Sequence, residues 1–298
     1  MTETLQQLGR RLASTEELNS VTSTMKGLAA VNVRHFQRAA QVMDRYEHTI
    51  ERGIQIVLRD TPDTEVRTAS SDPSGAAAVV VFGSNQGLCG PVNRHVVGHT
   101  REHLDAWLGD RMDRLEHVVA VGDRLAGELD VAELAPTEQH SLPSTLPGIG
   151  RRADDLLVRL DELLDQTPGI VIKLAYAHVG EREASYEPVI DQLVPLDEDW
   201  LASLRSRPWP TNQLPTYTMP RRAIFSSLTR HLLYVRLHRS FAQTMAAVAA
   251  SRMSAMESAQ ENVDERLQEL RRRHHLVRQS QITGELLDVV SGFEVING

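Results

Sequence analysis

The sequence has little of several features that define common classes of protein. It has one cysteine in 298 residues, which excludes an internal disulfide and a zinc site built on cysteine pairs. The longest uninterrupted apolar run, Ala76 to Phe82, has seven residues, far short of the roughly 20 that a transmembrane helix needs. The first residues, MTETLQQLGRR, contain no apolar signal core. We therefore expect a protein of a reducing compartment that neither spans a membrane nor is secreted.

Lysine is also scarce, and basic residues are outnumbered by acidic ones. The chain has 32 basic and 40 acidic residues, and only Lys26 and Lys173 are lysines. A net charge of -8 argues against nucleic-acid binding, which needs a basic surface. The exception is 221–280, which holds 11 basic and 5 acidic residues and includes the cluster Arg271 to His275. Such a cluster suits either a solvated helix face or contact with an acidic partner.

Proline is absent from both ends of the chain. All 13 prolines lie between Pro62 and Pro220, and proline costs about 3 kcal/mol inside a helix. This distribution predicts a helix over 1–60, an irregular or strand-bearing domain over 61–220, and a helix over 221–298. Because 195–220 holds five prolines, we expect a linker there.

Apolar residues recur every three or four positions in both end segments, as in Leu18, Val21, Met25 and Leu28. Helices of these lengths measure roughly 80 and 100 Å, too long for one compact domain to cover. They must therefore cover each other or a partner, which predicts an antiparallel coiled coil within the chain. The alternative is that one helix wraps around the middle domain.

The middle segment alternates between strand and helix patterns. We expect strands at 76–83, 118–121, 170–179 and 188–194, and helices at 93–108 and 151–164. Strands rich in Val and Ile and separated by helices indicate a largely parallel sheet covered on both faces. The fold class is therefore α/β plus coiled coil, with long antiparallel N- and C-terminal helices around a Rossmann-like α/β domain.

Three features of the middle segment bear on chemistry. The loop from Gly83 to Gly90 follows a strand, but it matches neither phosphate-binding glycine motif and has no lysine, so a tight turn is favoured over a nucleotide site. Cys89 within it is better read as a small packed residue than as a nucleophile. His95, His99 and His103 would share one helix face, yet no further ligand pattern accompanies them, which favours solvated histidines over a metal site. We expect no catalytic residue, cofactor or metal on this chain.

Several motifs resemble the gamma subunit of the F-type ATP synthase. Near the N-terminus stand Arg11-Leu-Ala-Ser14 and Val21-Thr-Ser-Thr-Met25-Lys-Gly-Leu-Ala-Ala30; in the middle stands Gly87-Leu-Cys-Gly90-x-x-Asn93. Near the C-terminus stand Ser251-Arg-Met-Ser-Ala-Met256, Arg278-Gln-Ser-Gln-Ile-Thr283-x-Glu-Leu286 and Val289-Val-Ser-Gly292. Their order and spacing cover nearly the whole chain.

The resemblance implies a rotor shaft of paired helices inside a ring of alternating alpha and beta subunits, with the catalytic sites on the beta subunits and no nucleotide on the shaft. It also implies an epsilon subunit and a membrane c-ring as partners, and a peripheral position on the cytoplasmic face of the cell membrane. Five residues match positions where the family's shaft meets the ring: Met25, Lys26, Arg278, Gln279 and Thr283.

The chain departs from the family pattern at a few places. Asn32 and Ser23 stand where the family has lysines, and Asn85 and Gln86 replace an acidic and basic pair. These departures suggest a diverged copy, as from a second ATPase operon. Two other functions stay open at this point: a nucleotide-binding α/β protein and a coiled-coil scaffold for unrelated partners.

Overall fold

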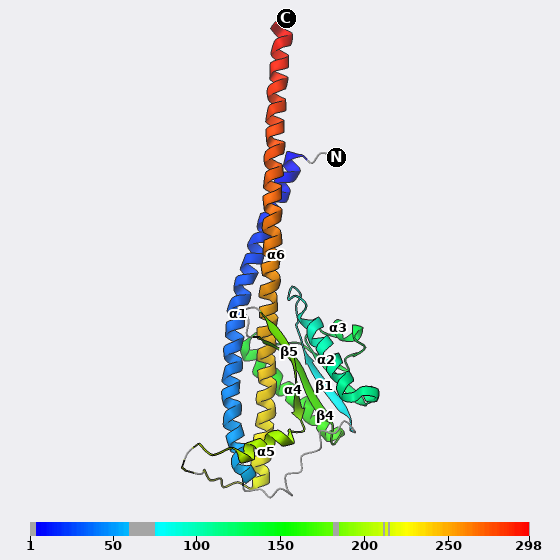
Figure 1. Ribbon diagram of the computed structural model, residues 1–298, viewed down its shortest axis with the longest axis vertical. Helices are drawn as coiled ribbons and strands as arrows, with labels where there is room; N and C mark the ends of the chain where they lie inside the picture. Colours follow the sequence, from blue (N-terminus) through cyan, green and yellow to red (C-terminus); the bar gives the residue numbers. More distant parts are fainter. Residues whose placement is uncertain (1–3, 60–74, 181–184, 211, 214, 298) are drawn as a thin grey trace. The chain divides into compact units, whose positions relative to one another are not determined.

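A computed structural model describes residues 4–59, 75–180, 185–210, 212–213 and 215–297, with side chains as far as Ser291. The described chain forms two compact units. The end unit consists of 1–29 and 253–298, and the central unit of 30–252. Two long helices contribute to both: α1 (Leu5–Arg59) and α6 (Arg221–Asn297) (Figure 1). The long helices expected at both ends of the chain are therefore confirmed. The division into three domains at residues 60 and 220 stays a prediction.

Within the central unit, a five-stranded sheet has the order β3-β2-β1-β4-β5. Its strands are β1 (Ala77–Phe82), β2 (Leu115–Val121), β3 (Glu138–His140), β4 (Val171–Val179) and β5 (Tyr186–Val194). The first four pair in parallel, and β5 runs antiparallel to β4 at the edge. The largely parallel sheet is confirmed, with one antiparallel edge strand that the sequence pattern did not distinguish.

Helices cover both faces of this sheet, as predicted (Figure 1). One face packs on α4 (Leu146–Gln166) and on parts of α1 and α6. The other packs on α2 (Val92–Leu108) and α3 (Ala126–Val131), with the 3-10 helix η2 (Gly109–Arg114) following α2. The continuous apolar strand β1 is buried along its whole length because helices lie against both of its faces.

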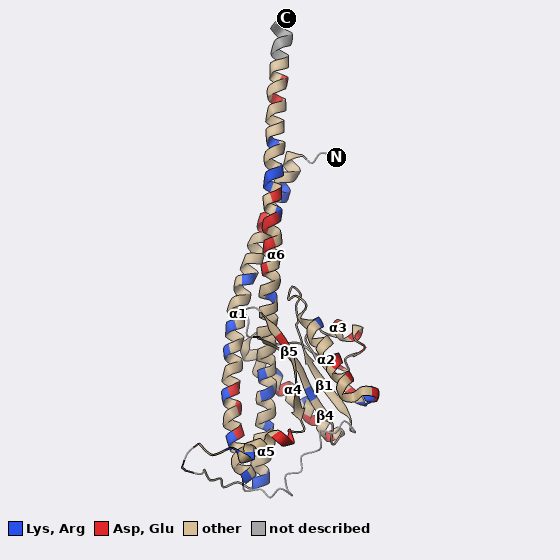
Figure 2. Cartoon of the chain, in the orientation of Figure 1, with Lys and Arg blue, Asp and Glu red and all other residues tan. Residues whose placement is uncertain are grey.

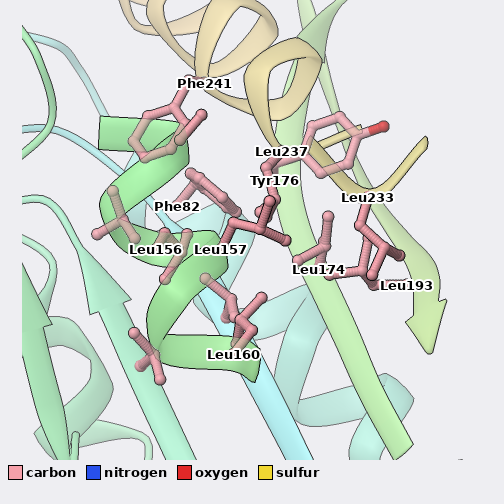
Figure 3. Packing of buried hydrophobic residues seen from close by; sticks show 14 of the residues in the cluster. Phe82, Leu156, Leu157, Leu160, Leu174, Tyr176, Leu193, Leu233, Leu237 and Phe241 are labelled. Carbon is pink, nitrogen blue, oxygen red and sulfur yellow. The ribbon is translucent and has the colours of Figure 1, made fainter. Parts of the chain in front are cut away.

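Aromatic and leucine side chains join the long helix α6 to the sheet. Phe241 of α6 meets Phe82 of β1 edge to face, with ring centroids 5.0 Å apart, and Leu156, Leu157 and Leu160 of α4 complete the cluster (Figure 3). Fully buried aromatic rings at this spacing add about 0.5–1.5 kcal/mol beyond their area burial. The central unit is therefore built on part of α6 as well as on its own sheet.

The expected linker contains a helix, α5 (Glu198–Ser206). Asp197 caps it by accepting a hydrogen bond from the Trp200 amide at 3.0 Å. Leu201 and Leu204 of α5 are buried against α1 and α6 in a third apolar cluster. The sequence pattern did not predict this short capped helix, which fits between the prolines of the expected linker.

Candidate functional site

The glycine loop after β1 is held by contacts within the central unit. Asn93 accepts a hydrogen bond from the Ser84 amide at 2.9 Å and donates one to the Ser84 hydroxyl at 3.0 Å. A Cβ on Gly83 would lie 2.7 Å from the Asn93 Oδ1 atom, so this glycine allows a close approach. The Ser251 hydroxyl of α6 donates to the Cys89 carbonyl oxygen at 2.6 Å. These contacts favour the structural reading of the loop.

Cys89 is buried, and its thiol donates to the Ser84 hydroxyl at 3.3 Å. Two of the three helical histidines, His95 and His103, lie against different partners. His95 Nδ1 lies 2.8 Å from the Tyr186 hydroxyl, and His103 Nε2 lies 3.0 Å from the Lys173 amine. Among the residues that the structure describes, no group of three or more His, Cys, Asp or Glu is placed to hold a metal ion.

The five family-matched contact residues all lie in the end unit, where α1 and α6 run antiparallel. Three polar pairs define the register: Glu16 with Arg271, Asn19 with Asp264, and Lys26 with Glu257. Their N-to-O distances are 2.8, 2.8 and 2.7 Å. The antiparallel pairing predicted for the two ends is thus present. Neither the register nor the Asn19 and Asp264 pair was predicted, because periodicity within one helix carries no information on its partner.

The contact residues form two groups rather than one patch. Lys26 is 35% exposed at its side chain and faces Glu257, while Arg278 stands 21 positions after Glu257 on α6, about 31 Å along the helix axis. Met25 is partly buried. Arg278, Gln279 and Thr283 are all exposed, and the Thr283 hydroxyl donates back to the Gln279 carbonyl. The two groups therefore offer separate contacts to any partner.

Much of the apolar stripe on α1 stays exposed. Leu18, Val21 and Leu28 are 55%, 53% and 61% exposed, although the sequence placed them on the stripe that should be covered. Among the residues of the end unit whose burial is described, the buried apolar ones are few: Leu8, Ala29, Met256, Leu267 and Leu270. The end unit thus covers only part of its apolar surface within this chain.

Within the described part of the chain, no helix faces the last turns of α6 (Figure 1). Continuing the antiparallel register sets Leu5, the first residue of α1, level with α6 near residue 280. Beyond it α6 exposes five large apolar side chains: Ile282, Leu286, Leu287, Val289 and Val290. Figure 2 shows that an acidic band and then a basic band on α6 precede this mostly uncharged end. No helix among the described residues is long and apolar enough to cross a membrane.

Taken together, the geometry defines a protein with a pair of long antiparallel helices and an α/β domain, whose candidate site is an exposed surface on the paired helices. A family model described as ATP synthase matches residues 4–296. The chain therefore belongs to the ATP synthase gamma family.

Curated relatives carry the name of this family, and solved structures share the fold. The chain is 25% identical to the ATP synthase gamma chain of Brucella ovis, over 98% of this chain and 99% of that protein. It is also 25% identical to the gamma chain of Sinorhizobium medicae, with the same shares covered. Among solved structures, a chain of the Euglena gracilis mitochondrial ATP synthase, OSCP/F1/c-ring, matches with a TM-score of 0.61 and 13% identity, over 98% of this chain and 94% of that one. A chain of the Tetrahymena thermophila mitochondrial ATP synthase central stalk/c-ring matches with a TM-score of 0.53 and 16% identity, over 80% and 99%.

Proposed function

We propose that this chain is the rotating central shaft of an F-type ATP synthase and couples ion flow across a membrane to ATP synthesis or hydrolysis on beta subunits. Relatives named ATP synthase gamma chain and the match to a central stalk support this proposal. The partners are a ring of alpha and beta subunits around the end unit, an epsilon subunit and a membrane c-ring. The chain then sits peripherally on the cytoplasmic face of the cell membrane.

The observation that carries the proposal is the exposed apolar surface of the end unit. Leu28 on α1 and Leu286 on α6 are each 61% exposed, and a fully buried leucine is worth roughly 1.5–3 kcal/mol. Surfaces of this kind mark sites that a partner covers. A surrounding ring would cover both helices, whereas the chain alone leaves them in water.

The polar contacts of the end unit suit a reversible contact with the surrounding ring of subunits. The Lys26 and Glu257 pair is partly exposed on both sides, so it contributes only about 0–1 kcal/mol and exchanges readily for a partner's carboxylate. Arg278 is exposed and forms no ion pair among the described residues. We propose that Met25 and Lys26 form one contact with the ring, and that Arg278, Gln279 and Thr283 form a second one.

Reconstitution with cognate alpha and beta subunits tests the function. We expect the complete set to assemble and to hydrolyse ATP faster than alpha and beta without this chain. Arg278→Ala should lower turnover of the assembled complex, while the matched control Arg222→Ala, an exposed arginine of the central unit, should leave it unchanged. Equal turnover with and without the chain would show that the chain is not the shaft. If calorimetry shows tight ATP binding by the isolated chain, the alternative of a nucleotide-binding protein gains support.

A further inference from the structure

Lys173 occupies an unusual place for a lysine. It stands on β4, where its register partners are Val79 of β1 and Gln192 of β5. Val79 and the β4 residues Ala175 and Ala177 belong to the cluster on the face that α2 covers. Because side chains alternate along a strand, Lys173 points to that same face. Its amine therefore lies between the sheet and α2.

Two side chains of α2 surround the amine. The Lys173 Nζ atom lies 3.0 Å from His103 Nε2 and 4.3 Å from the ring centroid of Trp107. Among the described residues, no carboxylate forms an ion pair with it. Lys26, the other lysine of the chain, has its Nζ atom 2.7 Å from a Glu257 carboxylate oxygen. The two lysines thus have opposite environments.

The surroundings favour the neutral form of this amine. Burial lowers the pKa of Lys173, because a desolvated ammonium loses hydration that a single aromatic face does not replace. Burial, the positive charge of Lys173 and the nearby His99 together lower the pKa of His103. His103 is therefore neutral near neutral pH, and its Nε2 atom is available to accept a proton from the amine. Lys173 is only partly buried, so a small reagent can reach it.

We propose that Lys173 is a nucleophilic amine that is acylated by small activated acyl donors such as acyl phosphates. The Nζ lone pair attacks the acyl carbon and forms the new C–N bond. The C–O bond to the phosphate breaks, and phosphate leaves with that electron pair. The proton released from the nitrogen passes to His103 Nε2. The product amide is uncharged, so it ends the cation–π contact with Trp107 and the contact between β4 and α2 through His103.

Treatment of the full chain with acetyl phosphate near neutral pH tests this proposal. Since the chain has two lysines, mass spectrometry of its peptides reads both sites in one sample. We expect Lys173 to be acetylated at least about threefold faster than Lys26, because a desolvated amine is less often protonated. In concentrated urea the two rates should become equal. Equal or slower reaction at Lys173 in the folded chain overturns the proposal.

His103→Gln tests the role of the neighbouring base. It keeps a polar group of similar reach but has no basic nitrogen. We expect the ratio of the Lys173 rate to the Lys26 rate to fall toward one, while the Lys26 rate stays unchanged. A ratio that is unaffected by this substitution removes His103 from the mechanism. The comparison of folded and urea-treated wild-type chain needs no variant, so the proposal stays testable even if His103→Gln folds poorly.

Discussion

The ion pairs around Glu47 give the sharpest test of how α1 and α6 are held together in the central unit. Glu47 is only 6% exposed, and its carboxylate accepts from Arg236 Nε at 2.9 Å and from Arg239 Nη1 at 2.7 Å. Removing one partner of a buried ion pair costs about 3–5 kcal/mol, since the remaining charge stays desolvated. Arg239 also has Asp44 and Asp191 carboxylate oxygens at 3.6 Å. We therefore expect Glu47→Gln to lower the free energy of unfolding by about 2–3 kcal/mol.

Urea denaturation followed by circular dichroism and tryptophan fluorescence measures this loss. All three tryptophans lie in the central unit, so fluorescence reports on the unit that holds Glu47. Asp155→Asn is the matched control in the same unit, because it neutralises the carboxylate of an exposed pair with Arg152 and should cost less than about 1 kcal/mol. If both substitutions shift their unfolding transitions by the same small amount, burial does not set the strength of the Glu47 pairs and our reasoning is wrong.

Three further outcomes follow from the central unit. Phe241→Ala should cost about 3–5 kcal/mol in urea denaturation, because the ring is 1% exposed and meets Phe82 edge to face; a loss under about 1 kcal/mol would contradict the packing. Gly83→Ala should lower the free energy of unfolding by about 1–3 kcal/mol, since the new Cβ would lie 2.7 Å from Asn93 Oδ1. Gly87→Ala, with open space around its Cβ, is the control and should change that free energy by less than about 0.5 kcal/mol. Burial lowers the pKa of His238 and of His103 below the ordinary value of 6.5. As the pH falls through that value, the unfolded chain therefore binds more protons than the folded chain. The free energy of unfolding should consequently be lower at about pH 5.5 than at about pH 7.5. In His238→Gln this pH dependence should be smaller, as measured by urea midpoints at both pH values.

The elements with strong local signals were predictable. The run of apolar residues at β1 and the absence of proline from both ends depend only on neighbouring residues, and both predictions are confirmed. The three-residue strand β3, with the sequence Glu-Gln-His, has no apolar pattern, so only its partner β2 defines it. The helix α5 was missed although Asp197 is a good N-cap, because the prolines on either side dominated the pattern.

Motifs named the candidate contact residues, whose role stays a prediction, and no sequence pattern predicted how these residues are arranged. Motifs placed Lys26 and Arg278 on two different helices. Which residues face each other depends on how the two helices are aligned, and Lys26 and its partner Glu257 are 231 positions apart in the sequence. Periodicity also predicted an apolar stripe through Leu18 and Leu28, and the spacing alone could not say whether this chain or a partner covers it. The structure leaves the Leu18 and Leu28 side chains exposed. The stripe is therefore better evidence for a partner than for packing within this chain.

The antiparallel pairing of the chain's two ends has a consequence for synthesis. Asn19 and Asp264, which form a hydrogen bond, are 245 positions apart. Because ribosomes add about 5–20 residues per second, the facing part of α6 is synthesised on the order of 10–50 s after α1. During that interval Leu8 and Ala29, which are buried in the folded end unit, are not yet covered by α6. We therefore expect the nascent chain to expose the apolar surface of α1 until α6 has been synthesised, as a substrate for a chaperone would.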